Sequence, residues 1–492
     1  MKHIVIAGGG FGGLYTAYHL EKRFRHNQGE MLLSLISHEN YFTFQPMLSE
    51  VVGGILGPLD SITPLRDMLK TTAIYRQEIL AINLEDQELT LSNFHGEPHT
   101  LNYDHLVLGL GAVTDFRTTP SLQAHALPFR TLSDSMAIRS QVIDCVEAAA
   151  VEKDPARRKA LLTFVVGGGD FHGVEVVAEI NDLARHVAAK TPGLSANDPH
   201  VVLASPSSAL YEGQLDPQLG EKAYLLLKKR GVDIRLSQSL IEATACSATL
   251  DGGESLSTMT TLSSLPLLPN PLIEGLPLEK EGGRLLAEAT LNIKGQDSLW
   301  AIGDCASIPN LIQGGECPPT AQFAIRQAKT LAHNIWAACK SEATLPFRFR
   351  CLGLMGSLGN HRAVGQIIGG IRLSGWIGWI MWRLIYWMKL PTIGRRIRVL
   401  KAWMIQAFLP IQTTSLHLHD RNPSPLSFPA NLPLPRGKYY LLIRGSLSQP
   451  CPLFSPIETL SQPITTTSPA LLLPLSADAY SACTFSKDKD KE

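Results

Sequence analysis

The sequence has few charges, no excess of either sign and no closely spaced cysteines. Charged residues make up 18% of the 492, and 44 Lys and Arg balance 44 Asp and Glu. Zero formal net charge argues against nucleic acid as a partner, because bulk electrostatics would not attract it. The eight cysteines form no C-x-x-C motif, which argues against a dithiol redox pair and against a zinc ribbon.

Two further features are missing. The N-terminus has no basic stretch followed by an apolar run, so no signal peptide is expected and a cytosolic, reducing setting is favoured. His417 and His419 alternate, but such a spacing is too weak to predict a metal site, and none is expected.

A pattern of strand, glycine turn and helix occurs twice. It is carried by KHIVIAGGGFGGLYTAYHL (2–20) and by LLTFVVGGGDFHGVEVVAEINDLARHV (161–187), and further strands are expected at 31–37 and 200–205. Two such units predict an α/β fold with two Rossmann-type dinucleotide-binding domains. The alternative is a pair of unrelated glycine-rich loops.

The first glycine turn is predicted to bind a dinucleotide. Gly8 permits the tight turn, Gly10 lets the backbone approach a pyrophosphate, and Gly13 lets helix and strand pack closely. The N-terminus of the following helix offers free N–H groups and a partial positive charge to phosphates. Ser37 ends the next strand, where an acidic residue commonly binds the ribose, and Glu39 follows two residues later.

A later strand end indicates that the dinucleotide is FAD. The segment SLWAIGDCA (298–306) carries Gly303 and Asp304 at a strand end, where the carboxylate would accept hydrogen bonds from a ribityl chain; a helix cap or turn residue is the alternative. Gly111, in the apolar segment 103–114, completes the expected FAD set.

The chain length suggests several domains. The predicted ranges are 1–115 and 281–346 for the two parts of the FAD-binding domain, 116–280 for an inserted nucleotide-binding domain, 347–418 for a membrane-associating region and 419–492 for a tail rich in Pro and Ser. The tail is predicted to be disordered from its composition.

Six motifs in order carry a family resemblance: GGGFGGL (8–14), NYFTFQPMLSEVVGG (40–54), YDHLVLGLGAVT (103–114), GVEVVAEI (173–180), WAIGDCA (300–306) and PPTAQFAIRQAKTLA (318–332). Over residues 1 to about 415 the chain resembles the type II NAD(P)H:quinone oxidoreductases, single-chain flavoproteins of the glutathione-reductase-like fold. The resemblance implies an enzyme with FAD in the first domain, NAD(P)H in the second and quinone as acceptor, without proton pumping. It also implies peripheral attachment to the cytoplasmic face of a membrane. Whether the chain forms a homodimer is left open.

The resemblance implies roles for individual residues. Glu179 resembles a catalytic glutamate near the flavin and nicotinamide rings, and Gln322 and Gln327 resemble the glutamines of an AQ-x-A-x-QQ quinone segment, although Arg326 replaces one glutamine of that segment. From the residues alone, Glu175 and Glu179 share one helix face. They are either solvated or partly buried, and burial would raise the pKa of a carboxyl group.

The second glycine turn departs from the pattern. Counted back from Gly173, Gly168 takes the first glycine position, and Asp170 takes the second, which faces the pyrophosphate. A like charge there would cost a few kcal/mol at an intermediate dielectric. In the alternative alignment, the turn carries a one-residue insertion. Gly167 and Gly169 then take the first and second glycine positions, and Asp170 bulges outwards.

Two more departures follow in the same domain. Ser205 ends the next strand, where NADH-preferring relatives carry an acid, and Leu265 and Pro266 replace a pair of small residues. We therefore expect NAD(P)H binding, assigned to Gly168, Gly173, Glu175 and Ser205, to be weakened or altered. A flavoprotein with another donor and a redox sensor are the alternative functions.

The segment between Glu342 and Asp420 contains no acidic residue and ten basic ones. Its apolar run LSGWIGWIMWRLIYWMKLP is shorter than the about 20 residues that a spanning helix needs. One stripe at helical spacing holds Trp376, Trp379, Trp382 and Tyr386, and a second holds Ile393, Ile397, Leu400, Met404 and Phe408. The pattern predicts helices lying in a bilayer interface, and a buried aromatic helix beside a solvated basic one is the alternative.

Overall fold

The computed structural model describes residues 1–25, 29–93, 97–117, 119–264 and 267–416. Four residues that carried expectations, Leu265, Pro266, His417 and His419, lie outside these ranges, as does the predicted tail 419–492.

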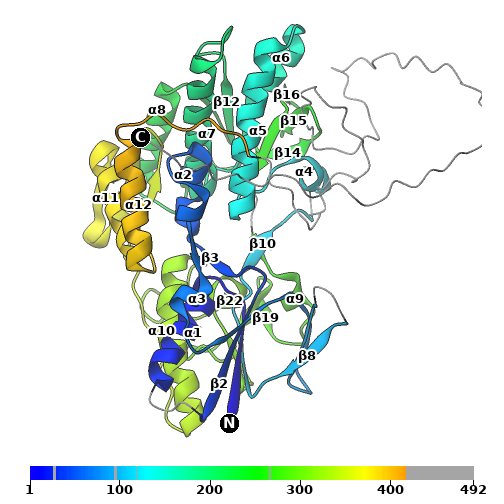
Figure 1. The fold of residues 1–492 in the computed structure, drawn as a ribbon, viewed down its shortest axis with the longest axis vertical. Coiled ribbons are helices and arrows are strands. Elements are labelled where there is room, and N and C mark those ends of the chain that lie inside the picture. The colour runs from blue at the N-terminus through cyan, green and yellow to red at the C-terminus, as the bar shows by residue number, and fades with distance from the viewer. Residues whose placement is uncertain (26–28, 94–96, 118, 265–266, 417–492) are drawn as a thin grey trace, which may run out of the picture. The chain divides into compact units, whose positions relative to one another are not determined.

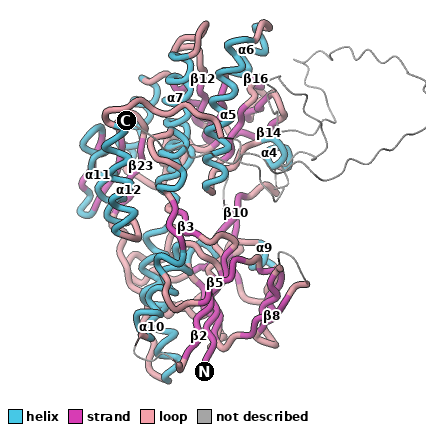
Figure 2. The backbone as a smooth tube through the Cα atoms, viewed as in Figure 1, coloured by secondary structure: helices cyan, strands magenta, loops and turns pink. Residues whose placement is uncertain are grey.

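The first sheet is a parallel Rossmann-type sheet of five strands (Figures 1 and 2). Its order is β21 (Leu299–Ala301), β9 (His105–Leu108), β1 (Lys2–Ala7), β2 (Met31–Ser37) and β5 (Ala73–Arg76). The central strands are continuous apolar runs, as expected for a parallel sheet buried on both faces. On one face α1 (Phe11–Phe24) packs against α10 (Ala321–Lys340).

Smaller elements complete this domain. An antiparallel sheet holds β6 (Ile79–Asn83), β7 (Glu88–Leu91) and β8 (His99–Asn102), and another pairs β3 (Tyr41–Thr43) with β4 (Ile62–Pro64). The short helices are η1 (Gln45–Met47), α2 (Leu48–Gly53), η2 (Pro58–Asp60), α3 (Leu65–Met68), α9 (Pro271–Glu274) and η3 (Gly303–Cys305). A last sheet joins β19 (Lys280–Glu281), β20 (Arg284–Leu286) and β22 (Ala306–Ser307).

The second parallel sheet has the order β13 (Val232–Leu236), β12 (His200–Ser205), β11 (Thr163–Gly167) and β17 (Thr260–Ser263). Its helices are α4 (Pro120–His125), α5 (Leu132–Val151), α6 (Pro155–Leu161), α7 (Phe171–Lys190) and α8 (Pro217–Lys229), and β14 (Leu240–Ala243), β15 (Ser247–Leu250) and β16 (Ser255–Ser257) form an antiparallel sheet beside it. The chain enters and leaves through one antiparallel pair, β10 (Ala112–Thr114) with β18 (Leu267–Pro269). The expected fold of two Rossmann-type units is confirmed.

The C-terminal region is a β-meander followed by two helices. The strands are β23 (Gly353–Ser357), β24 (Ala363–Ile367) and β25 (Ile371–Ser374), with η4 (Ile368–Gly370) between the last two. Helices α11 (Gly375–Lys389) and α12 (Ile393–Gln406) follow and lie side by side (Figure 1). No helix in the described part of the chain is long and apolar enough to cross a membrane.

Only Trp376 of the predicted aromatic stripe of α11 is exposed, and the other three residues face inward. Trp382 is completely buried, and Trp379 and Tyr386 pack in the same cluster beneath the helix. The exposed face of α11 is mainly aliphatic and consists of Trp376, Ile377, Ile380, Leu384 and Met388. The aromatic rings turn inward because they pack against apolar side chains of the meander, such as Met355 and Ala363. The spacing of the aromatic residues alone does not show that this packing surface exists.

The second predicted stripe does face outward. Ile393, Ile397, Leu400, Met404 and Phe408 are all exposed, between 44% and 86%. Together with the exposed face of α11, the four of these residues that lie on α12 (Ile393, Ile397, Leu400 and Met404) form what we call the apolar platform, an exposed surface of large hydrophobic side chains on two neighbouring helices. Extended apolar surfaces of this kind mark interaction sites.

Arg383 fastens the two helices to α2, which packs against α5 and α7. Its guanidinium lies 3.0 Å from the buried carboxylate of Glu50 on α2, between the rings of Trp379 and Trp403 at 4.2 and 4.6 Å. The indole N–H of Trp403 donates to the other oxygen of Glu50 at 2.7 Å. Arg383 therefore points into the protein rather than toward lipid.

Candidate functional site

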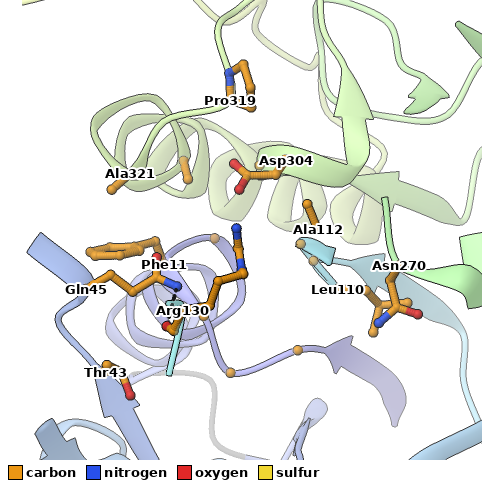
Figure 3. A pocket seen from close by; sticks show the side chains of 18 of the residues that line it. Phe11, Thr43, Gln45, Leu110, Ala112, Arg130, Asn270, Asp304, Pro319 and Ala321 are labelled. Carbon is orange, nitrogen blue, oxygen red and sulfur yellow. Dashed lines mark hydrogen bonds between the residues drawn. The ribbon is translucent and has the colours of Figure 1, made fainter. Parts of the chain in front are cut away.

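A cavity of about 1240 Å³ opens at the carboxyl ends of the first sheet's strands (Figure 3). Its wall combines the first glycine turn, the ends of β2 and β9, the start of α10, the first turn of α7, and parts of β23 and α11. Parallel α/β sheets bind their ligands at this end. The volume exceeds the about 300–1,000 Å³ typical of small-molecule pockets, so an extended ligand fits.

The first glycine turn has the geometry that a pyrophosphate needs. Gly8 has a φ of +110°, and a Cβ on Gly13 would lie 1.9 Å from the carbonyl oxygen of Gly8, so both positions require glycine. A Cβ on Gly10 would meet none of the described protein atoms within 4 Å. Gly10 is also the N-cap of α1 and, having no side chain, leaves the helix N-terminus uncovered. The uncovered N–H groups and the helix dipole therefore face open space suited to an anion.

Ser37 ends β2 and Glu39 follows two residues later, where a ribose-binding acidic residue is common in such folds. Ser37 is buried, and its Oγ would lie 2.4 Å from a Cβ on Gly9, so its small size lets the turn approach β2. Glu39 also lines the cavity and retains a half-exposed carboxylate. Glu39 is thus the carboxylate available to a ribose.

Asp304 lines the cavity, as the sequence predicts. Arg130 also lines the cavity, and its side chain points toward Asp304 (Figure 3). Burial raises the pKa of Asp304, and the charge of Arg130 opposes that rise. Burial lowers the pKa of Arg130, while the charges of Asp304 and Asp134 oppose that change. No motif pointed to Arg130, because an isolated arginine before a helix start forms no pattern with its neighbours. Gly111 lines the same wall.

The two predicted quinone-segment glutamines lie in different surroundings. Gln322 lines the cavity, donates to the carbonyl oxygen of Gly353 at 3.3 Å and accepts the N–H of Leu352 at 3.2 Å. Gln327 is buried and accepts the N–H of Gly303 at 3.1 Å, so it holds the strand end that carries Asp304. Arg326 is exposed and lies over the ring of Phe349 at 5.6 Å.

Glu175 lines the cavity, whereas Glu179 lies one helical turn away and outside its wall. Glu175 accepts the N–H of Ser357 at 2.8 Å, and burial raises its pKa to about 8 against the opposing effects of that N–H and of His172. Glu179 is 1% exposed, and burial, together with the charges of Asp182 and Glu50, raises its pKa well above the usual value. The structure therefore brings Glu175 to the site and places Glu179 in the buried network behind it.

Lys389 and Tyr386 of α11 close the same end of the cavity as Gln322. Burial lowers the pKa of Lys389, and the nearby charge of Arg326 lowers it further. Neither residue was predicted for the site, because both belong to a helix whose residue spacing indicated a membrane surface.

The second glycine turn keeps the form of the first. Gly168 has a φ of +132°, and a Cβ on Gly173 would lie 2.1 Å from the carbonyl oxygen of Gly168. Asp170 is the N-cap of α7 and accepts the N–H of Gly173 at 2.9 Å, so it occupies the second glycine position and does not bulge outwards. Ser205 is buried against Gly169, as Ser37 is against Gly9.

Comparisons with known proteins agree with this geometry. Residues 2–328 match the family of pyridine nucleotide-disulphide oxidoreductases, and residues 351–410 match the NDH2 C-terminal domain. The chain belongs to the pyridine nucleotide-disulphide oxidoreductase family. The identification as a FAD-dependent, NAD(P)H-using enzyme related to the type II NAD(P)H:quinone oxidoreductases is thereby confirmed.

Individual relatives are similar over most of their length. The type II NADH:quinone oxidoreductase NdhA of Mycobacterium tuberculosis is 28% identical over 420 residues, covering 82% of this chain and 86% of that protein. The demethylphylloquinone reductase NdbB of Synechocystis is 29% identical over 407 residues, covering 82% and 95%. The structure of NDH2 from Plasmodium falciparum in complex with NADH has a TM-score of 0.77 at 18% identity, covering 84% of this chain and 99% of that one, and supports the fold.

A methyl group at Gly10 should weaken FAD binding without unfolding the protein. In Gly10→Ala the new Cβ meets no neighbour in the described chain but enters the space open to the pyrophosphate, so we expect roughly tenfold weaker FAD binding, or about 1.4 kcal/mol. The flavin-to-protein absorbance ratio and a far-ultraviolet circular dichroism spectrum measure the two effects. Gly394→Ala, another open glycine position on α12, should retain its flavin. Full flavin occupancy and affinity in Gly10→Ala would show that the dinucleotide does not approach this turn.

Proposed function

We propose that this chain transfers electrons from NAD(P)H through FAD to a quinone at a membrane surface. The observation that carries the proposal is the continuity of the cavity, whose wall runs from the first glycine turn past Asp304 to Glu175, Gln322 and Lys389. When bound, FAD would accept a hydride from the nicotinamide and pass two electrons to the acceptor.

The chain's own residues supply binding and orientation. The N-terminus of α1 would hold the pyrophosphate, with Gly10 allowing its approach, and Glu39 would accept the ribose hydroxyls. Asp304 and Arg130 would flank the ribityl chain and the flavin ring. The NAD(P)H positions assigned to Gly168, Gly173 and Ser205 lie at the second turn.

The acceptor end combines apolar and proton-bearing groups. Met355 and Tyr386 supply apolar surface, and Gln322, Lys389 and Glu175 supply polar atoms. Reduction of a quinone to a quinol takes up two protons. A carboxyl group with a pKa of about 8 is mostly protonated at neutral pH, so Glu175 is placed to donate one of them. The sequence-based assignment gave this role to Glu179, and the cavity geometry favours Glu175.

The apolar platform is the proposed contact with the membrane. Its exposed side chains belong to α11 and α12, and α11 also supplies Lys389 and Tyr386 to the cavity. A quinone dissolved in lipid would then reach the site beside the helices that bind the surface. Attachment is proposed to be peripheral and on the cytoplasmic face, and a homodimer stays a prediction.

A second candidate function, a flavoprotein with another donor or a redox sensor, is favoured only by Asp170 in the second turn. Rapid mixing of the purified protein with NADH or NADPH should bleach the flavin, and a quinone should restore its colour. Absence of bleaching by either nucleotide at millimolar levels would contradict the proposed function. Bleaching without reoxidation by a quinone would favour the sensor.

Glu175 should give quinone reduction its pH dependence. The rate of reoxidation of chemically reduced protein by a soluble quinone should fall as pH rises through about 8, because the carboxyl group loses the proton that it donates. Glu175→Gln should be slower by roughly a hundredfold and insensitive to pH in this window. Glu179→Gln is the matched variant one turn along the same helix and should keep the wild-type profile. The opposite outcome, a lost pH dependence in Glu179→Gln alone, would return the role to Glu179.

Charges on the apolar platform should release the protein from membranes. The double variant Ile380→Glu with Met404→Glu removes one exposed side chain from each helix, and we expect binding to anionic liposomes to weaken by roughly a hundredfold. Co-sedimentation measures binding, and flavin content reports folding. Leu225→Glu alters an equally exposed leucine on α8 and should bind normally. Unchanged binding of the double variant would contradict the assignment of this surface.

A further inference from the structure

The two glycine turns of this chain can be compared position by position. Gly8 and Gly168 both have positive φ, and a Cβ on Gly13 or Gly173 would collide with the carbonyl oxygen of Gly8 or Gly168 at 1.9 or 2.1 Å. These contacts fix the first and last positions of each turn. Because both the positive φ of the first glycine and the close contact of the last glycine recur, the two turns share one backbone conformation.

The second residue of each turn confirms the alignment. A Cβ on Gly9 would lie 2.4 Å from the Oγ of Ser37, and a Cβ on Gly169 would lie 2.2 Å from the Oγ of Ser205. Each serine ends the strand that follows its turn's helix. Gly10 and Asp170 are therefore equivalent, and each is the N-cap of its helix, with φ and ψ of −76° and −166° for Gly10 and −82° and −176° for Asp170.

The equivalent helix ends differ in what occupies them. Gly10 leaves the N-terminus of α1 open. At α7 the carboxylate of Asp170 accepts the N–H of Gly173 at 2.9 Å and the hydroxyl of Ser264 at 3.1 Å. An N-cap carboxylate binds the same N–H groups and the same positive end of the dipole that a phosphate would use.

The carboxylate is held in its charged form. Burial would raise the pKa of Asp170, but the nearby His172 and the hydrogen bonds from Gly173 and Ser264 outweigh it and lower the pKa below its usual value. The imidazole of His172 lies 3.7 Å away and offsets part of this charge when protonated. A dinucleotide would thus bring its own negative charges against a partly compensated carboxylate.

We propose that Asp170 determines donor specificity by occupying the place of the pyrophosphate at the second turn, so that this chain recognises mainly the nicotinamide half of its donor. This inference rests on the proposed function. Ser205 strengthens it, because a buried serine in place of a carboxylate leaves the adenosine ribose without its usual acceptor. The large cavity, lined by Phe171 and Glu175, is unaffected and stays available to the nicotinamide ring.

The protein should therefore bind a dinucleotide donor only slightly more tightly than a shorter donor with the same reacting ring. Dihydronicotinamide riboside has the reacting ring but neither the pyrophosphate nor the adenosine. Calorimetry on the holoenzyme, with its flavin first reduced by dithionite, measures binding of either donor without electron transfer. For the wild-type protein the two dissociation constants should lie within about tenfold, or about 1.4 kcal/mol.

Asp170→Gly should bind NADH about tenfold or more tightly than the wild type and bind the riboside unchanged. The substitution restores the residue that the first turn carries at this position. Asp170→Asn keeps an oxygen that accepts the N–H of Gly173 but removes the charge, and it should lie between the two. Asp154→Gly is the control, because Asp154 is also an N-cap, at a remote site, where its carboxylate accepts the N–H of Ala156 at 3.0 Å.

Dissociation constants for NADH within about twofold of wild type in both Asp170 variants would overturn the inference. If Asp170→Gly does not retain flavin, the Asn variant decides alone. A wild-type protein that binds NADH more than about a hundredfold tighter than the riboside would also overturn it. Failure of both donors to bleach the flavin in every variant would instead contradict the proposed function, while the binding constants still report on Asp170.

Discussion

An anion can approach the N-terminus of α1 only because Gly10 has no side chain. The positions around it are fixed by contact: Gly8 and Gly13 touch backbone, and Gly9 touches Ser37. Gly10 alone of these four has open space beyond its Cα among the described residues, so the turn is packed on three sides and open on one. Glu39 and Asp304 of the first domain and Arg130, which precedes α5, line the cavity into which this opening leads.

A second constraint connects the cavity with the apolar platform. Glu50 of α2 is buried where α2 packs against α5 and α7, and it binds both Arg383 of α11 and Trp403 of α12. An unpaired carboxylate at this depth would be costly, and the two aromatic rings on either side of Arg383 exclude water from the pair. The same helix carries Lys389 and Tyr386 into the cavity, so the anchoring of α11 also positions this part of the cavity wall.

The two glycine turns of this chain differ at the helix N-terminus, which is open at α1 and capped by a carboxylate at α7. Gly10 and Asp170 have the same backbone conformation at equivalent helix ends, and they differ in one side chain. An aspartate stabilises a helix as an N-cap, and it does so with the N–H groups that a phosphate would otherwise bind. Local helix stability and ligand affinity are therefore opposed at this position.

Local patterns were enough to establish the fold and the first glycine turn. Strand, turn and helix spacing fixes which backbone N–H groups point outward, and this depends on residues that are neighbours in the chain, so Gly8, Gly10, Gly13 and Asp304 could be placed from the sequence. Arg130, Lys389 and the choice of Glu175 over Glu179 were decided by tertiary packing, because a helix face or a strand end becomes a cavity wall only when a distant segment lies opposite it. The aromatic residues of α11 show the same limit: their spacing determined that they share a face, but only the meander beneath them decided that Trp382 turns inward.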